Sequence, residues 1–142
     1  MEEKREAQVW QRVLSQPPEA CSGSVEALLR ESAALAAVYR RVFEKSTGRQ
    51  RLLAKQLLEA EEATAASLRG IAKLKGEPAE SLKTWQPGKN GRTALEGCYH
   101  RTLRCQAEYT ARSLDRQFGE VYRLLAERCT RQCLLLTQLL GG

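Results

Sequence analysis

Histidine and aromatic residues are scarce in this chain, which limits the chemistry that it can perform. The 142 residues include one His, and Phe, Trp and Tyr together make up 6%. The lone His100 adjoins no plausible nucleophile, so a Ser-His-Asp catalytic set is excluded. No Gly-rich phosphate loop follows a predicted strand, and the basic turn over residues 88–92 is interpreted as a solvent loop.

Long apolar runs are also missing. No stretch approaches the roughly 18 consecutive apolar residues of a membrane-spanning helix. The first six residues are mostly charged and lack the apolar run of a secretory signal. We therefore expect a soluble, cytoplasmic protein that does not act on a membrane.

A disulfide framework is not expected either. The chain has five cysteines, which cannot all pair with one another, and their helical settings are typical of buried core residues. They are Cys21, Cys98, Cys105, Cys129 and Cys133. We expect these thiols to be reduced.

The basic charge of the chain is spread out rather than concentrated. The formal net charge is +6, yet Glu interrupts the Arg and Lys runs of the basic segments. No aromatic residues interleave with a basic strip, as they do in many nucleic-acid sites. We expect a solvated, mildly basic surface and no nucleic-acid partner.

The sequence does contain strong helical patterns. Hydrophobic residues make up 42% and charged residues 28%, with only four prolines, which favours an all-α protein. Residues 1–18 are predicted to hold a short amphipathic helix, because Val9, Trp10 and Val13 share one face and Pro17-Pro18 ends it. This segment is neutral, which favours packing on the outside of a larger domain over a membrane-surface role.

Four longer helices are predicted in residues 22–142. Each has a seam of inward positions alternately three and four residues apart. The seams are Val25, Leu28, Ser32, Leu35, Tyr39 and Val42; Ala54, Leu57, Glu61, Thr64, Leu68 and Ile71; Leu95, Cys98, Thr102, Cys105 and Tyr109; and Phe118, Tyr122, Leu125, Cys129, Gln132, Leu136 and Leu139.

The connections between these helices predict two antiparallel pairs. Gly48 is expected to close the first of the four helices, and residues 113–116 form a short turn between the third and fourth. A Gly- and Pro-containing segment at about residues 76–92, which includes Trp85, forms a crossover. At about 3.3 Å per residue it can run the length of a bundle, so the third helix is expected to start at the same end as the first.

The two halves of this domain look like copies of one another. Ser32 lies seven residues before Tyr39, and Thr102 lies seven residues before Tyr109. The second and fourth helices then carry polar pairs at similar intervals. This similarity indicates which positions correspond between the halves.

The polar seam positions follow the pattern of a di-metal helix bundle. In ferritin-like proteins, two helices each supply one Glu, and two others each supply a Glu-x-x-His. The matching positions are Ser32, Glu61 with Thr64, Thr102, and Cys129 with Gln132. Over roughly residues 24–140 the chain resembles the ferritin-like superfamily, in particular small bacterial rubrerythrin-like proteins.

The resemblance implies an antiparallel four-helix bundle with one long crossover and a degenerate di-iron site. Only Glu61 of the six ligands is retained, and one carboxylate with hydroxyls, a thiol and an amide cannot balance two hard cations. We therefore expect no metal and no cofactor, and loss of the ferroxidase, peroxidase and oxygenase chemistry of the family. Tyr39 and Tyr109 match aromatic positions beside that site.

Other interpretations of the same residues stay open. The polar seam residues could satisfy one another as a closed hydrogen-bond network around Glu61, or the helix could be rotated so that Glu61 or Glu62 reaches an Arg at the rim. Alternatively, Cys105 and Cys129 could face each other and form an altered site for iron, manganese, zinc or copper, or a redox thiol pair.

We expect a catalytically inactive ferritin-like protein that is structural or that binds a partner or a small ligand. Its partner is either an unidentified protein or a second copy of itself as a homodimer. The alternative is a metal-binding or redox protein that retains an altered Cys and Glu site.

Overall fold

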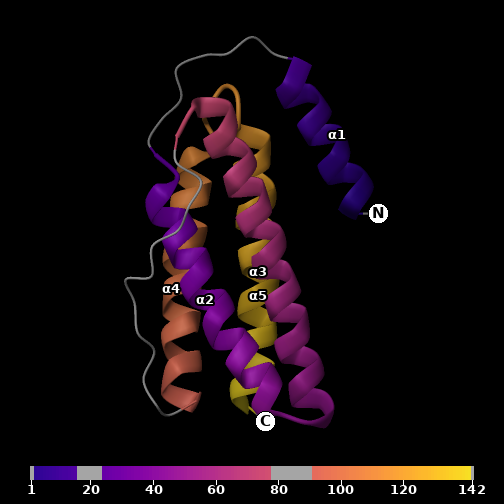
Figure 1. Cartoon of the computed structure of the whole chain (residues 1–142), viewed down its shortest axis with the longest axis vertical. Helices are drawn as coiled ribbons and strands as arrows, with labels where there is room; N and C mark the ends of the chain where they lie inside the picture. The colour runs from indigo at the N-terminus through magenta and orange to yellow at the C-terminus, as the bar shows by residue number, and fades with distance from the viewer. Residues whose placement is uncertain (1, 16–23, 78–90, 142) are drawn as a thin grey trace.

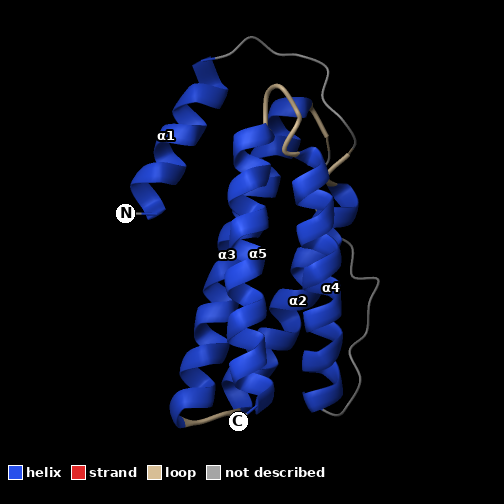
Figure 2. Cartoon of the chain, turned by 180° about the vertical axis from the view of Figure 1, so that it is seen from behind, coloured by secondary structure: helices blue, strands red, loops and turns tan. Residues whose placement is uncertain are grey.

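The structure, a computed structural model, describes residues 2–15, 24–77 and 91–141, and in these ranges it is helical without strands. The predicted all-α class is confirmed (Figure 2). The helices are α1 (Glu2–Ser15), α2 (Glu26–Lys45), α3 (Gly48–Lys75), α4 (Gly91–Arg112) and α5 (Gly119–Gly141). The predicted crossover lies mostly outside the described residues, as do Trp85 and Cys21.

Helices α2 to α5 lie side by side, with α1 against one side of them (Figure 1). The end of α4 lies beside the start of α2, because Arg112 Nη2 donates to the Ser24 carbonyl oxygen at 2.8 Å. The start of α4 lies beside the end of α5, where Arg92 Nη1 donates to the Leu140 carbonyl oxygen at 2.8 Å. Packed neighbours among these four helices are therefore antiparallel.

The expected starting end of α4 was wrong. The backbone N–H of Val25 donates to Glu77 Oε1 at 3.0 Å, so α3 finishes where α2 begins. The start of α4 lies beside Leu140 at the end of α5, which is the opposite end of the bundle. Helix α4 consequently begins at the far end from the start of α2 (Figure 1).

Two turns depend on glycine. Gly76 has φ +72° and closes α3 in the left-handed region, which glycine adopts without a Cβ penalty. Gly48 has φ +59° but begins α3, whereas α2 ends at Lys45 with Ser46 extended. The expectation that Gly48 closes the earlier helix was therefore wrong.

The turn between α4 and α5 is held by side-chain and close backbone contacts. Asp115 Oδ1 accepts hydrogen bonds from the backbone N–H groups of Gln117 and Phe118, both at 2.9 Å. A Cβ added to Gly119 would lie 2.4 Å from the Ser113 carbonyl oxygen, so this position requires glycine.

The predicted seams form the interior, although Val42 is only partly buried. The apolar side chains divide into two clusters toward the two ends of the bundle. One contains Leu29, Leu68, Tyr109 and Phe118, and the other contains Leu35, Leu57, Cys98 and Leu136. Polar seam residues lie between them, so the middle of the bundle is polar and contains the ionisable side chain of Glu61.

Helix α1 packs on the outside of the bundle, as its pattern predicts. Val9 and Val13 are buried, and a Cβ at Gly70 of α3 would come within 3.0 Å of the Trp10 ring. Ion pairs flank this apolar contact: Arg5 with Glu127 at 2.9 Å, and Arg12 with Glu120 at 2.5 Å.

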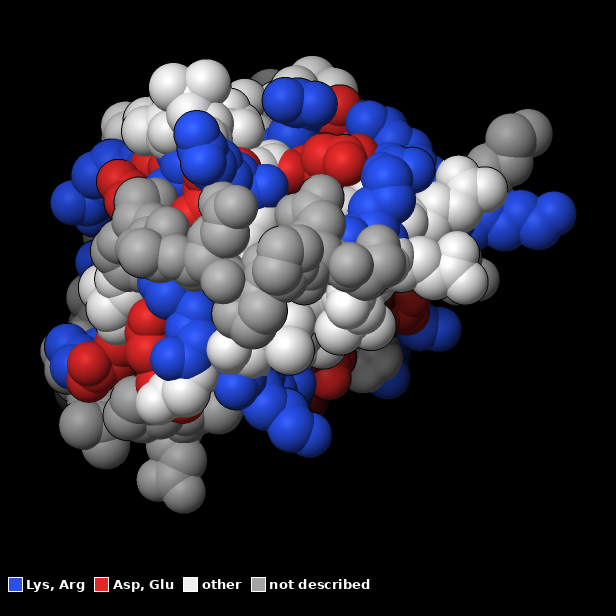
Figure 3. Space-filling view, turned by 90° about the horizontal axis from the view of Figure 1, so that it is seen from above, with Lys and Arg blue, Asp and Glu red and all other residues white. Residues whose placement is uncertain are grey.

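Basic and acidic side chains intermix on the end of the molecule where α2 starts (Figure 3). Arg112 of α4, for example, pairs with Glu108 at 2.7 Å. The absence of a nucleic-acid partner stays a prediction. In the described ranges, none of the helices combines the length and the hydropathy that crossing a membrane requires.

Candidate functional site

All six positions that match the di-metal ligands lie in the interior. Each side chain is at most 4% exposed, and together they come from all four bundle helices. They are Ser32 of α2, Glu61 and Thr64 of α3, Thr102 of α4, and Cys129 and Gln132 of α5. We call these six residues the central layer.

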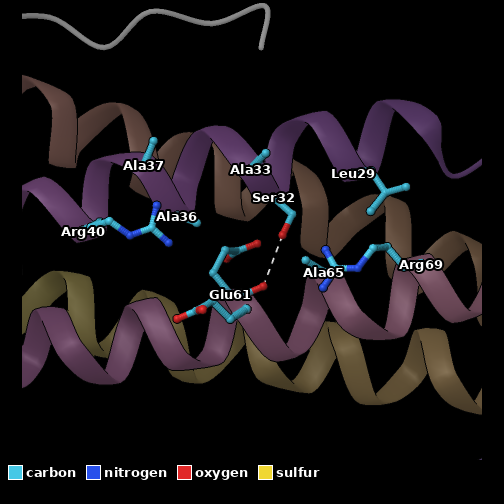
Figure 4. Close-up of a pocket in the computed structure, with 10 residues that line it drawn as sticks. Leu29, Ser32, Ala33, Ala36, Ala37, Arg40, Glu61, Ala65 and Arg69 are labelled. Carbon is cyan, nitrogen blue, oxygen red and sulfur yellow. Dashed lines mark hydrogen bonds between the residues drawn. The ribbon is translucent and has the colours of Figure 1, made fainter. Parts of the chain in front are cut away.

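Glu61 is the carboxylate of the central layer, and it is held by hydrogen bonds from two neighbouring helices. Gln132 Nε2 donates to Glu61 Oε2 at 2.7 Å. Ser32 Oγ donates to the backbone carbonyl oxygen of Glu61 at 3.2 Å (Figure 4). Because α2 and α5 both contact it, Glu61 ties α3 to two different neighbours.

Burial raises the pKa of Glu61 from 4.5 to about 7. Removal from water disfavours the carboxylate, and this effect exceeds the opposing stabilisation by Gln132, Ser32 and the positive charge of Arg128. Near neutral pH the side chain is therefore divided between its neutral and charged forms. The neutral form can also donate a hydrogen bond, which a carboxylate cannot.

Arg128 is a buried cation next to this layer that the sequence interpretation missed. It is 5% exposed, and its Nη1 donates to Thr64 Oγ1 at 3.1 Å. Its Nη2 donates to Glu6 Oε2 of α1 at 3.3 Å, and the other oxygen of Glu6 accepts from Ser67 Oγ at 3.0 Å. Helix α1 thus supplies the countercharge of a guanidinium inside the bundle.

The two tyrosines expected beside the layer are both buried. Burial raises the pKa of Tyr39 and of Tyr109 well above 10, and the charge of Glu61 contributes to both shifts. The Tyr39 hydroxyl and Thr102 Oγ1 are buried and make no hydrogen bond of normal geometry with a described residue, although Thr102 lies close enough to Tyr39 to oppose part of the rise in its pKa. Tyr109 stacks on Tyr122 with ring centroids 6.3 Å apart.

The cysteines near the layer are free thiols. Cys105 and Cys129 belong to one cluster of buried side chains, as the sequence allowed, and Cys133 is half-buried. Burial raises the pKa of Cys98 and of Cys105 to about 12, and it raises that of Cys129 further. The thiol forms therefore dominate at neutral pH, whereas metals and oxidants react with thiolates.

These residues do not fit a pair of iron-like ions. Within the described ranges, no group of three or more His, Cys, Asp and Glu side chains could hold a metal ion. The carboxylate at the centre accepts from an amide, and the nearest buried charge is the guanidinium of Arg128. Such a donor set lacks both the negative charge and the imidazoles that two hard divalent cations require.

A groove opens from the surface toward Glu61 between α2 and α3 (Figure 4). Its volume is about 300 Å³, and four alanines form much of its wall. Arg40 and Arg69 lie at its two ends, and Ser32 and Glu61 lie between them (Figure 4). Of the six residues of the central layer, only Ser32 and Glu61 line this groove, and both are nearly fully buried.

Comparisons of the chain with protein families, with curated proteins and with solved structures find no match.

Proposed function

We propose that the protein is a catalytically inactive, ferritin-like four-helix bundle of the rubrerythrin-like type, which is structural or binds a partner or small ligand in the cytoplasm. The observation that supports this most directly is the hydrogen bond from Gln132 to Glu61 at the centre of the bundle. The amide of Gln132 stands at the position where the resemblance implies a histidine ligand. It donates a hydrogen bond to Glu61, the one retained carboxylate.

The order of the helices supports the ferritin-like part of the proposal. Two antiparallel pairs, α2 with α3 and α4 with α5, are joined by one connection between opposite ends of the bundle. This is the layout of ferritin-like bundles with a single long crossover.

The charges around the centre support the loss of di-iron chemistry. A buried guanidinium next to Thr64 opposes the entry of divalent cations, since like charges repel strongly in a medium of low dielectric constant. Activation of oxygen or peroxide at such a centre requires at least one bound metal ion that can change its oxidation state. We therefore propose that the interior of this bundle serves binding and not catalysis.

The alternative is a metal-binding or redox protein that uses Cys105, Cys129, Glu61 and Gln132. The shared burial of the two thiols in one cluster favours it. The raised pKa values of both thiols oppose it, because a metal must displace a thiol proton at a large free-energy cost.

Elemental analysis separates the two proposals. Protein expressed in medium supplemented with iron, manganese and zinc should contain less than one metal ion per chain, with all five thiols titratable after unfolding. One or more ions per chain that are lost in Glu61→Ala or Cys129→Ser would establish the alternative. Gel filtration would separately decide whether the protein forms a homodimer.

A further inference from the structure

The groove between α2 and α3 combines a size, a wall and a charge distribution that suit one class of ligand. Its volume of about 300 Å³ lies at the lower end of the range of small-molecule sites. The wall includes Ala33, Ala36 and Ala37 of α2 and Ala65 of α3. These methyl groups leave room for a narrow aliphatic chain and offer it apolar contact.

Two guanidinium groups define the ends of this groove. Arg40 extends from α2 and Arg69 from α3, and their guanidinium groups point toward each other along the groove (Figure 4). Neither side chain has a hydrogen bond or an ion pair with another described residue. Elsewhere on α2, Arg30 pairs with Glu26 one turn away, so unpaired arginines are not the rule on this helix.

The groove floor carries groups that accept or donate hydrogen bonds. Ser32 and Glu61 both line it, and Glu61 is 3% exposed. Gln132 holds Glu61 from the α5 side, which fixes the carboxyl group at the base of the groove. The exposed carboxylate of Glu62 also lines the groove, and it reduces the positive charge there together with the charged form of Glu61.

We propose that this groove binds a small linear dicarboxylate, with one carboxylate on Arg40, the other on Arg69, and the aliphatic spacer against the alanines. Guanidinium groups recognise carboxylates through two parallel hydrogen bonds. One such group at each end selects a ligand with two acids separated by a spacer. The inference rests on the proposed function, because in a di-metal centre Glu61 would be a metal ligand and not part of the groove floor.

Isothermal titration calorimetry of the full chain with succinate, glutarate and adipate tests the proposal, with butyrate as the single-acid comparison. At least one dicarboxylate should bind about tenfold or more tightly than butyrate, because the second acid adds a hydrogen bond to a charged group. Arg40→Gln and Arg69→Gln should each reduce dicarboxylate affinity about tenfold, to the level of butyrate.

Three further variants distinguish groove binding from general attraction to a basic protein. Lys45→Gln on α2 and Lys73→Gln on α3 remove exposed charges that do not line the groove, and they should leave the affinity within about twofold. Ala36→Met fills the groove without changing charge and should abolish binding. Circular dichroism confirms that each variant is folded.

A fourth variant should improve binding. Glu62→Gln removes the carboxylate at the groove and should tighten dicarboxylate binding, an effect that a merely structural role for the groove would not produce. Equal affinities of wild type, Arg40→Gln and Ala36→Met would overturn the inference, as would the absence of binding by all three dicarboxylates.

The metal content of the same samples keeps the two proposals apart. Metal-poor protein that binds no dicarboxylate would refute the dicarboxylate site and leave the proposed function standing. Protein with one or more metal ions per chain that are lost in Glu61→Ala or Cys129→Ser would refute the proposed function, whatever the calorimetry gives.

Discussion

Gln132 Nε2 of α5 lies 2.7 Å from Glu61 Oε2 of α3, and both side chains are buried. Removing one partner of a buried hydrogen bond leaves the other without water or protein to replace it. Gln132→Leu should therefore lower the free energy of unfolding by about 1–3 kcal/mol, measured by urea unfolding at pH 7. Gln138→Leu, on the exposed face of the same helix, serves as the control and should change stability by less than about 0.5 kcal/mol.

Glu61 should make the protein less stable as the pH rises. Its pKa in the folded state is about 7, against 4.5 in the unfolded chain, so between these values the folded state binds the extra proton. Unfolding then releases that proton, and the contribution of Glu61 falls progressively from pH 4.5 to above pH 7. The pKa difference corresponds to about 3 kcal/mol.

Glu61→Gln isolates this contribution. The difference in unfolding free energy between Glu61→Gln and wild type should grow in favour of the variant from pH 5 to pH 8. Glu62→Gln, at an exposed neighbouring position, should run parallel to wild type over the same range. A difference that shrinks with rising pH would mean that Glu61 is held by a positive charge.

The contact between Glu6 and Arg128 should contribute more to stability than the ion pairs around it. Glu6→Ala leaves a guanidinium that is 5% exposed without its carboxylate, whereas the Arg5 and Glu127 side chains are about half exposed. Because Glu6 itself is partly exposed, we expect a loss of about 1–3 kcal/mol. Glu127→Ala should cost less than about 1 kcal/mol.

A double variant tests whether the stability lost in Glu6→Ala comes from the charge of Arg128. Glu6→Ala combined with Arg128→Met should recover most of the stability lost in Glu6→Ala, because an apolar side chain needs no countercharge. Arg128→Met alone completes the comparison. If the double variant loses as much stability as Glu6→Ala and Arg128→Met together, packing and not charge explains the effect.

The two buried hydroxyls without partners should be dispensable for folding. Tyr39→Phe and Thr102→Val remove polar atoms that make no hydrogen bond of normal geometry with described residues. Each variant should unfold within about 0.5 kcal/mol of wild type or be more stable, as measured by urea unfolding. A loss above about 1 kcal/mol in either would mean that the hydroxyl has a partner, such as a buried water molecule.

The sequence was sufficient to predict the helices and the composition of the central layer. A repeat of three and four residues identifies inward positions whatever their chemistry, so Ser32, Thr64 and Gln132 were found although they are polar. The direction of α4 was predicted wrongly. The length of the connection shows that it can reach from one end of the bundle to the other, but the end at which the connection starts depends on the directions of α2 and α3.

Arg128 was missed because arginine usually lies at the surface, and nothing local marks it as buried. The available signal was its position four residues before Gln132, which places both on one face of α5. Its countercharge could not be predicted, because Glu6 is 122 residues away in the sequence and reaches Arg128 only when α1 packs on the bundle. The groove likewise depends on the spacing of α2 and α3, which the seam pattern does not specify.

The most direct test of this account is the titration of the Glu61 carboxyl group by NMR, on protein labelled with ¹³C at glutamate carboxyl carbons and assigned with Glu61→Gln. The resonance should titrate with a pKa near 7 and be unchanged when zinc or manganese is added. A pKa below 4.5 would contradict a centre in which burial keeps Glu61 partly protonated, and a resonance that shifts or broadens at one metal ion per chain would show that a cation binds there.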